Sequence, residues 1–206
     1  MISGVTQTTA QRIPYGVGVY FKGVPFDVNV APTLEAIKAG AFGATQEGGT
    51  ATITTEWWAP EVDGVTVEME ELQHKIGEAG QMDVSFMELT PELIKNTVIG
   101  KITETTDKKY DVITSDVLRK GHIYEGFGFY GHFLNGRPFI ILFKKALCKS
   151  GFSSNPKNKE NNLFKGTFTC LSDSEFSTTK LPYAIFLYKN DAWVAANPEE
   201  AAAASA

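Results

Sequence analysis

The stretch between Gly43 and Leu89 constrains the fold most, because three segments in it alternate regularly between apolar and polar residues. Residues 50–57 alternate Ala, Ile, Thr and Trp with Thr and Glu. Residues 65–70 alternate Val and Met with Thr and Glu, and residues 82–86 alternate Met, Val and Phe with Asp and Ser. Strict alternation is typical of a β-strand with one buried and one wetted face. Three such strands in so short a stretch predict an antiparallel sheet that is solvated on one side.

The predicted wet side of this sheet is rich in threonine and carboxylates and has no Lys or Arg at the alternating positions. Its acidic members are Glu56, Glu68, Glu70 and Asp83. Trp57 falls on the opposite side and is expected to pack in the core. Trp58 would point outward at the end of its strand, which suits an interface. A function for this chain has to account for a large sheet with a polar, acidic face.

Composition and charge exclude several classes of protein. The chain has 206 residues, 43% hydrophobic and 21% charged, which suits one globular domain of generous size. The net charge of −5 argues against generic nucleic-acid binding, which needs a basic surface to displace counterions. No apolar run approaches the ~18 residues of a membrane-spanning helix, and residues 1–12 lack the apolar core of a signal peptide. We therefore expect a protein that is made and used without a secretion signal or a membrane.

One strong hairpin signal lies in the second half of the chain. Asn135-Gly136 separates two apolar runs, residues 123–134 and 138–148, and Asn-Gly in this setting favours a tight turn. Residues 139–143 are apolar on both faces, which predicts a central strand that is covered on both sides. Further strands are predicted at residues 15–22, 110–113, 162–171 and 184–189.

Two short helices are expected beside the strands. Residues 34–38 have a helical pattern that Gly40 would end. Thr90 can cap a second helix, Pro91 suits its first turn, and Gly100 would end it. The expected domain organisation is one β domain over residues 1–194, with an N-terminal arm at 1–13, and a flexible Ala-rich tail at 195–206.

The sequence predicts no metal site and no thiol chemistry. His74, His122 and His132 do not form a metal-ligand spacing with Cys148 and Cys170, and no CxxC occurs. A Cys-His nucleophile pair is conceivable, but the first cysteine lies inside a predicted strand. Both cysteines are expected to be buried, reduced thiols, because free cysteine is among the most buried residue types. The sequence leaves a disulfide between them open.

Acidic and glycine-rich segments offer two more candidates for chemistry. Glu68, Glu70 and Glu71, with Glu78 and Asp83 nearby, could form a glycosidase-like acid pair, although carboxylates that alternate along a strand are more typical of a solvated face. Residues 43–49 are rich in glycine but have no Lys and no strand-then-helix context, so they do not predict a phosphate cradle. We expect no catalytic residue, no metal and no cofactor.

Three motifs stand in a set order between residues 14 and 100. Gly-Ala-Thr-Gln-Glu-Gly-Gly at 43–49 precedes a Thr-rich strand, Pro-Glu-Val-Asp-Gly at 60–64 follows it, and a strand at 82–89 runs into Thr-Pro-Glu-Leu at 90–93. In this order they resemble the tail tube proteins, or major tail proteins, of long-tailed bacteriophages. The second half of the chain matches that family in strand content alone. The resemblance implies an antiparallel β-sandwich or half-barrel with a flanking helix and long loops, which closes with other subunits into an oligomeric β-barrel.

The resemblance also implies partners and a location. In such proteins six subunits close a ring, and rings stack into a tube through which DNA leaves the head without specific binding. The subunit would be assembled in the bacterial host cytoplasm and reside in the virion tail, in contact with its own copies, the tape measure, the tail terminator and the baseplate. Closing sheets around a ring removes exposed edges, and head-to-tail contacts generate rings when the rotation closes.

This interpretation assigns roles to the polar residues of the central stretch. The four wet-face carboxylates would line the lumen and repel DNA, unless they are ordinary solvated residues on the outer wall. The polar connections within residues 59–80 would contact neighbouring rings or subunits. The contact candidates are Trp58, Pro60, Asp63, Gly64, Gln73, His74, Lys75, Gly77 and Glu78.

Two alternatives of other classes stay open. One is a non-catalytic baseplate, decoration or carbohydrate-binding β-sandwich that uses Trp57, Trp58 and Tyr15. The other is a hydrolase that uses the carboxylates. Rings or tubes of purified protein favour the tail tube, and a monomer that binds glycans favours the binding module.

Overall fold

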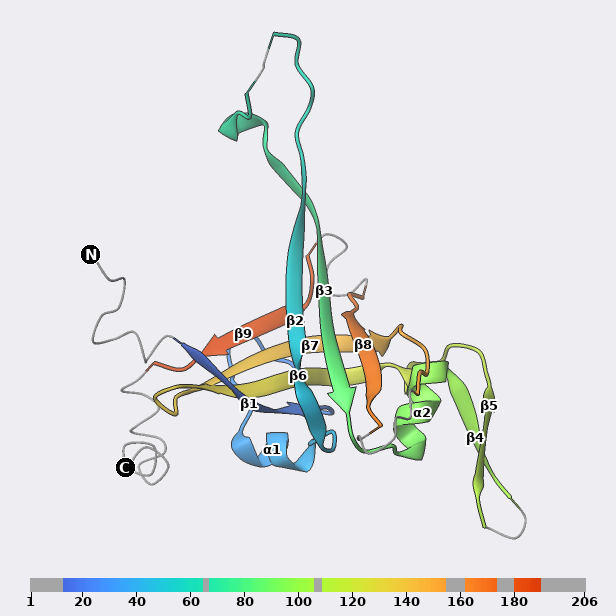
Figure 1. The fold of residues 1–206 in the computed structure, drawn as a ribbon. Coiled ribbons are helices and arrows are strands. Elements are labelled where there is room, and N and C mark those ends of the chain that lie inside the picture. Colours follow the sequence, from blue (N-terminus) through green and yellow to red (C-terminus); the bar gives the residue numbers. More distant parts are fainter. Residues whose placement is uncertain (1–12, 65–66, 106–108, 155–161, 174–179, 190–206) are drawn as a thin grey trace.

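The fold is mainly β, with antiparallel pairing and few helices, as the sequence predicted. It is known from a computed structural model, which describes residues 13–64, 67–105, 109–154, 162–173 and 180–189 (Figure 1). The N-terminal arm up to residue 12 and the Ala-rich tail lie outside the described residues. In chain order the elements are β1 (Pro14–Phe21), α1 (Leu34–Ala39), β2 (Thr45–Trp58), the 3-10 turn η2 (Glu70–Leu72), β3 (His74–Phe86), α2 (Pro91–Val98), β4 (Gly100–Glu104), β5 (Asp111–Ser115), the 3-10 turn η3 (Lys120–His122), β6 (Tyr124–Phe133), β7 (Pro138–Cys148), β8 (Phe164–Cys170) and β9 (Tyr183–Leu187).

Seven of the described strands form one sheet that branches at β7. The order is β1-β6-β7-β8-β3-β2, and β9 also pairs with β7. One edge of β7 pairs with β6, whereas the other edge pairs with β9 along Phe139–Phe143 and with β8 along Ala146–Cys148. The sheet therefore turns over on itself, and β2 and β3 cross in front of β6 and β7 at a steep angle (Figure 1). Among the described residues of the single chain no closed barrel forms, and β4 and β5 make a separate hairpin.

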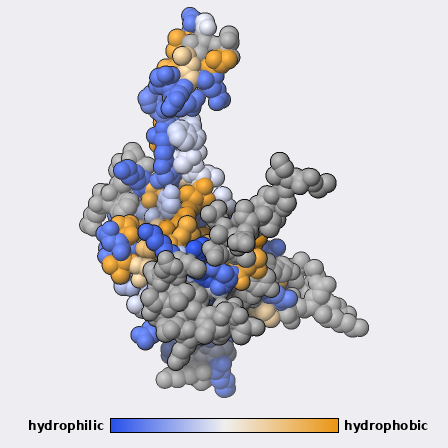
Figure 2. Space-filling model, turned by 90° about the vertical axis from the view of Figure 1, so that its left-hand side faces the viewer, coloured by the Kyte–Doolittle hydropathy of each residue, from blue (hydrophilic) through white to orange (hydrophobic). Residues whose placement is uncertain are grey.

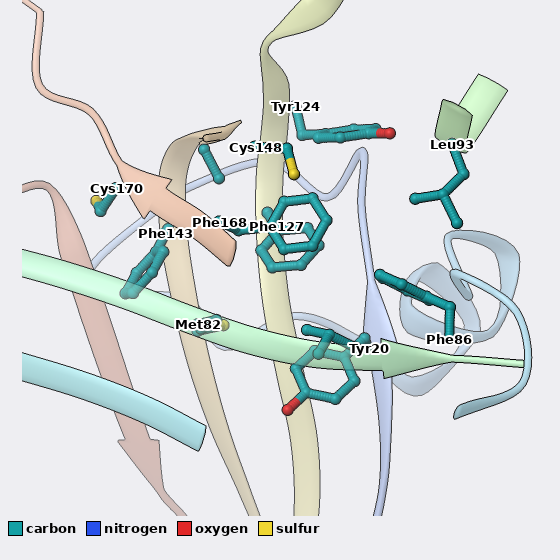
Figure 3. Packing of buried hydrophobic residues seen from close by; sticks show 12 residues of the cluster. Tyr20, Met82, Phe86, Leu93, Tyr124, Phe127, Phe143, Cys148, Phe168 and Cys170 are labelled. Carbon is teal, nitrogen blue, oxygen red and sulfur yellow. The ribbon is translucent and has the colours of Figure 1, made fainter. Parts of the chain in front are cut away.

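The main hydrophobic core lies between the two crossing parts of the sheet (Figure 3). Met82 and Phe86 of β3 and Phe168 of β8 face Phe127 of β6 and Phe143 of β7, and each of these side chains is at most 1% exposed. The rings of Phe127 and Phe168 stack with centroids 4.4 Å apart. Aromatic side chains bury the largest apolar areas per residue, so this cluster is the main source of cohesion between the two layers.

A second core covers the other face of β1, β6 and β7. Ile140 and Leu142 of β7 point into it, together with Phe21 of β1, and α1 contributes Ile37. Phe143 and Ala146 point into the main core instead, so both faces of β7 are buried at Leu142 and Phe143. The prediction of a central strand covered on both sides at residues 139–143 is therefore confirmed only in part, because Phe139 and Ile141 are half-buried.

The prediction of a strand at residues 65–70 is wrong for residues 67–70, and residues 65 and 66 lie outside the described residues. β2 pairs directly with β3, from Thr45 opposite Phe86 to Trp58 opposite His74. Residues 67–73 belong to the loop between these strands and include the turn η2, and Val67 is 72% exposed. Residues 74–80, which were predicted to be a polar connection, are the first half of β3. Val67 and Met69 have no second layer to cover them, so the alternating pattern did not produce a strand there.

Local signals at the helices and at the second hairpin are confirmed. The hydroxyl groups of Thr33 and Thr90 accept hydrogen bonds from the first turns of α1 and α2. Gly136 takes a positive φ of 79° in the turn between β6 and β7. α2 ends one residue before the expected glycine, because Ile99 takes the left-handed cap position with φ 53°.

Both cysteines are buried, unbonded thiols, as predicted. Burial raises the pKa of Cys170 to about 12. A thiol with so high a pKa is almost entirely protonated near neutral pH and is a poor nucleophile.

None of the helices in the described part of the chain combines the length and apolar character needed to cross a bilayer.

Candidate functional site

The outer face of β2, β3 and β8 is lined by hydroxyl and amide groups rather than by acids. Cross-strand pairing places Thr50 beside Asp83 and Asp83 beside Thr167, and it aligns Thr52, Gln81 and Thr169 in the next row. The Asp83 carboxylate is fixed in place, since Thr167 Oγ1 donates to its Oδ1 at 2.6 Å and Gln81 Nε2 donates to its Oδ2 at 2.9 Å. A shallow hollow of about 320 Å³ opens on this face between Gly48–Thr50, Asp83–Ser85 and Lys165–Thr167.

The structure separates the four carboxylates that were predicted to share this face. Asp83 lies on it, and Glu56 pairs with Gly77 on the same side of β2 further along the hairpin. Glu68 and Glu70 are outside the sheet, in the exposed loop beyond β2 and in the turn η2. β8 adds Lys165 opposite Ser85. The predicted acidic face is therefore a mostly neutral, hydroxyl-rich face with two carboxylates and one lysine among its described residues.

The distal half of the β2–β3 hairpin projects from the body as an arm, which we define as residues 54–79 (Figure 1). β8 pairs with β3 between Gln81 and Phe86 and no further, so among the described strands the arm contains two. A two-stranded ribbon is marginally stable on its own in water. Large apolar side chains of the arm are nevertheless exposed to solvent. They are Trp57 at 58%, Trp58 at 53%, Val62 at 46%, Val67 at 72%, Met69 at 42% and Ile76 at 50%.

The prediction that Trp57 packs in the core is wrong. Its indole nitrogen donates to Thr55 Oγ1 at 2.9 Å, so it keeps to the face of β2 that carries Ile53. Ile53 packs against the main core, but the body ends before it reaches Trp57. Trp58 is exposed as predicted and stacks on His74, with ring centroids 6.1 Å apart.

Eight of the nine contact candidates lie on the arm surface or its loop, and the ninth is internal. Glu78 has a side chain that is only 6% exposed, and its Oε2 accepts a hydrogen bond from the Leu181 N–H at 2.8 Å. Its other oxygen pairs with Lys75. The Leu181 N–H, followed by Lys75, lowers the pKa of Glu78. Glu78 therefore braces the base of the arm against its own body, and it is not available to another subunit.

A second surface, which sequence analysis missed, is the part of the β6-β7-β9 face that β2 and β3 leave uncovered. We call it the open sheet face. Register aligns Phe129 of β6 with Ile141 of β7 and Ile185 of β9, and Phe139 lies beside Leu187 in the next row. Ile185 and Leu187 are 49% and 62% exposed, and the three other residues are half-buried. Hydrophobic residues are visible on this side of the molecule below the arm (Figure 2). The signal was the apolar run in residues 183–187, but the sequence did not reveal which strand β9 would join.

The structure does not assemble the candidates for catalysis. Cys148 is buried among aromatic rings. His122 is also buried, with Nδ1 accepting the Arg119 N–H and Nε2 lying 2.8 Å from the Gly100 carbonyl oxygen. Glu70 and Glu71 are both exposed on the arm. Within the described residues no three His, Cys, Asp or Glu side chains are grouped as a metal site would require.

The aromatic residues of the alternative binding module are also dispersed. Tyr15 is near the start of β1, where its backbone pairs with His132 of β6. Trp57 and Trp58 are on the arm, which leaves the body in a different direction (Figure 1). A single glycan site built from all three residues is therefore not formed.

No family model matches this chain, and no curated protein matches it in sequence.

Proposed function

We propose that this protein is a structural subunit of a bacteriophage tail tube, which self-assembles into stacked rings around a channel for DNA. The observation that carries the proposal is the arm, a two-stranded extension that exposes six large apolar side chains among its described residues. Exposed apolar surface of this extent marks a contact with another macromolecule. A structural role is also consistent with the dispersed His, Cys and carboxylate groups, and we propose no enzymatic activity and no cofactor.

Open strand edges support closure into a ring. β1 and β2 stand at the two ends of the sheet path, and each pairs with one neighbour among the described strands, although residues 40–42 bond to the end of β1 at Tyr20 and Phe21. The edge of β2 runs over 14 residues, Thr45–Trp58, and contains no proline. A long open edge favours pairing with another chain unless it is protected. Pairing from subunit to subunit would join the sheets into one barrel, and six copies is the number that the resemblance to tail tube proteins implies.

The hydroxyl-rich outer face of β2, β3 and β8 is our candidate for the channel wall. Threonine and glutamine side chains offer phosphate no cation, and Glu56 and Asp83 add negative charge that a narrow channel would focus. Lys165 adds one positive charge to this face, which would attract phosphate. In this arrangement DNA would pass without binding, because few cations are presented to it.

The arm is our candidate for contacts between rings, which agrees with the sequence prediction for residues 59–80. Other tail proteins, such as the tape measure, terminator and baseplate, would meet the first and last rings. The proposed location is the virion tail, after assembly in the host cytoplasm.

An arm deletion tests the proposal. Residues 60–72 are replaced by Asn-Gly, which favours a tight turn between Trp58 and His74. The deletion spares residues 74–80, because these belong to β3 and removing them would break the strand. We expect a folded subunit that forms no tubes, whereas the parent protein forms rings or tubes in negative-stain images at high concentration. A parent protein that stays monomeric at every concentration would contradict the proposed function.

The channel wall is tested separately in virions that carry Thr50→Lys and Thr52→Lys. Both positions are exposed and lie outside the arm, so tails of normal length are expected. DNA ejection should slow, because the new cations would capture phosphates. The matched control is Thr50→Gln together with Thr52→Gln, which adds no cation to the same strand. Normal ejection by the lysine variant would show that another face lines the channel.

A further inference from the structure

We propose that the arm of one subunit docks on the open sheet face of a second copy in a head-to-tail contact. The inference rests on the proposed function only for its biological setting, since the contact itself can be measured with purified protein. It assigns both sides of the interface: the arm supplies Trp57, Val62 and Ile76, and the face supplies Ile185 and Leu187 with the half-buried aromatic rings around them.

The two surfaces match in apolar character. Each presents large side chains that are about half exposed, such as Trp57 at 58% and Ile185 at 49%. The face is a flat row of β positions, because Phe129, Ile141 and Ile185 lie side by side on three neighbouring strands. Aromatic anchors that bury against a flat apolar surface are the usual source of affinity in protein interfaces. Contact between the two would remove both exposed surfaces from water.

The two surfaces are opposite in charge. The arm has Glu56, Glu61, Asp63, Glu68, Glu70 and Glu71 at exposed positions, against one described lysine, Lys75, which pairs with Glu78. The open sheet face is bordered by cations. Residues 180–189 contain Lys180 and Lys189 and no acidic residue, and Arg137 lies beside Phe133 at the end of β7 that pairs with β9. Opposite charge at the rim steers association and selects the register.

Open strand edges at both surfaces would allow backbone hydrogen bonds to add to the side-chain contact. β9 pairs with β7 alone among the described strands, so its second edge is open. The arm has open edges as well, because β2 and the first half of β3 pair only with each other in the described part of the chain. Addition of an extended strand to an exposed sheet edge is a common mode of recognition.

The arm is held away from the open sheet face of its own subunit. Glu78 at the base of the arm binds the Leu181 N–H just before β9, and Gly80 is in close contact with the Leu181 side chain. This brace fixes the arm base beside the start of β9 while the ribbon rises away from the body (Figure 1). The complementary surfaces of one chain therefore diverge, and the partner for each has to be another copy.

A complementation experiment tests the contact with full-length protein. One variant loses the arm surface through Trp57→Ser and Ile76→Ser, and the other loses the face through Ile185→Asp and Leu187→Asp. At a protein concentration too low for rings to close through the strand edges, we expect each variant alone to sediment as a monomer in analytical ultracentrifugation. Their equimolar mixture should form a one-to-one dimer and nothing larger, because one intact arm and one intact face remain. Val28→Asp with Val30→Asp is the matched control, at positions 57% and 62% exposed and outside both surfaces, and it should assemble like the parent.

Charge reversal gives a second readout. Lys189→Glu should weaken the mixed dimer by about tenfold at roughly 50 mM salt, and Glu61→Lys on the partner should restore it. The inference is overturned if the mixture stays monomeric, or if either surface variant assembles like the parent. Tubes that persist in the face variant overturn the inference and leave the tail tube proposal intact. Assemblies that need both surfaces but enclose no channel support the inference and refute the tail tube.

Discussion

The two halves of the β2–β3 hairpin differ in one respect, which is whether a third strand and a second layer cover them. In the body half, residues 81–86 of β3 pair with β8 and bury Met82, Val84 and Phe86. In the arm half, residues 74–79 pair with β2 alone, and Trp57 and Ile76 remain about half exposed. The same alternating pattern thus gives a core in one half and an interaction surface in the other. The comparison shows that alternation sets which face a side chain occupies, whereas burial depends on what lies above that face.

The prediction with the largest expected effect replaces one aromatic residue in each half by alanine. Phe168→Ala removes a ring that is completely buried against β3 and stacked on Phe127, so we expect a loss of about 3–5 kcal/mol in the free energy of unfolding. Trp57→Ala on the arm should change the free energy of unfolding by at most about 0.5 kcal/mol. Urea denaturation of dilute, monomeric protein measures both. Similar losses for the two variants would mean that the arm packs on its own body.

Two glycines of β3 locate the boundary between the halves. A Cβ at residue 80 would lie 2.6 Å from Leu181 Cδ2 and 3.3 Å from Phe143 Cζ, so Gly80→Ala should destabilise the fold by about 1–3 kcal/mol. A Cβ at residue 77 would meet only the flexible Glu56 carboxylate, at 3.1 Å. Gly77→Ala should therefore be neutral to within about 0.5 kcal/mol in the same denaturation assay. Equal effects at the two positions would place the boundary elsewhere.

The brace between the halves predicts a pH dependence. The Leu181 N–H and Lys75 lower the pKa of Glu78 below its unfolded value, so its contribution to stability is present above the unfolded pKa of about 4.3. That contribution is lost as the pH falls through the lower folded pKa. Glu78→Gln should cost about 1 kcal/mol at pH 7 and should lose less stability than the parent between neutral and acid pH. Parallel stability curves for the two proteins would exclude Glu78 as the brace.

The smallest effect is expected where the sequence placed a strand and the structure has a loop. Glu68→Lys with Glu70→Lys should change the free energy of unfolding by no more than about 0.5 kcal/mol, because both side chains are exposed on the arm. The pair should impair assembly and not DNA passage, since neither residue belongs to the candidate channel wall. Slow DNA ejection from tails of normal length would indicate that these carboxylates do line the channel.

Local patterns predicted the elements, and long-range pairing decided what they became. Asn135-Gly136, Thr90-Pro91 and the row of Met82, Val84 and Phe86 act through neighbours a few residues away, so their outcomes followed from the sequence. The pairing of β3 with β8, and of β7 with β9, depends on contacts between distant segments that no local pattern specifies. Val67 and Met69 suggested a strand because their local pattern alternates. Only the three-dimensional structure shows that no second layer covers them.

The candidate surfaces were predictable to different degrees. Trp58 and the loop after it were expected to be exposed, and Trp58, Val62 and Val67 are. Glu78 looked like a surface acid because its partner, the Leu181 N–H, lies 103 residues away in the chain. The open sheet face was missed because Ile185 and Leu187 follow the pattern of an ordinary half-buried strand. Their exposure results from the steep crossing of β2 and β3, which covers only part of that face.

The pairing of β3 with β8 also has a consequence for synthesis on the ribosome. Thr167, which anchors Asp83 across this pair, is made 84 residues later, a delay on the order of ten seconds at typical rates of translation. During that interval Met82, Val84 and Phe86 have no covering strand, and non-local β pairing of this kind is slow to form. A nascent chain released before Phe164 would keep this apolar row exposed, so premature termination is expected to yield aggregates or chaperone-bound fragments in place of a smaller folded protein.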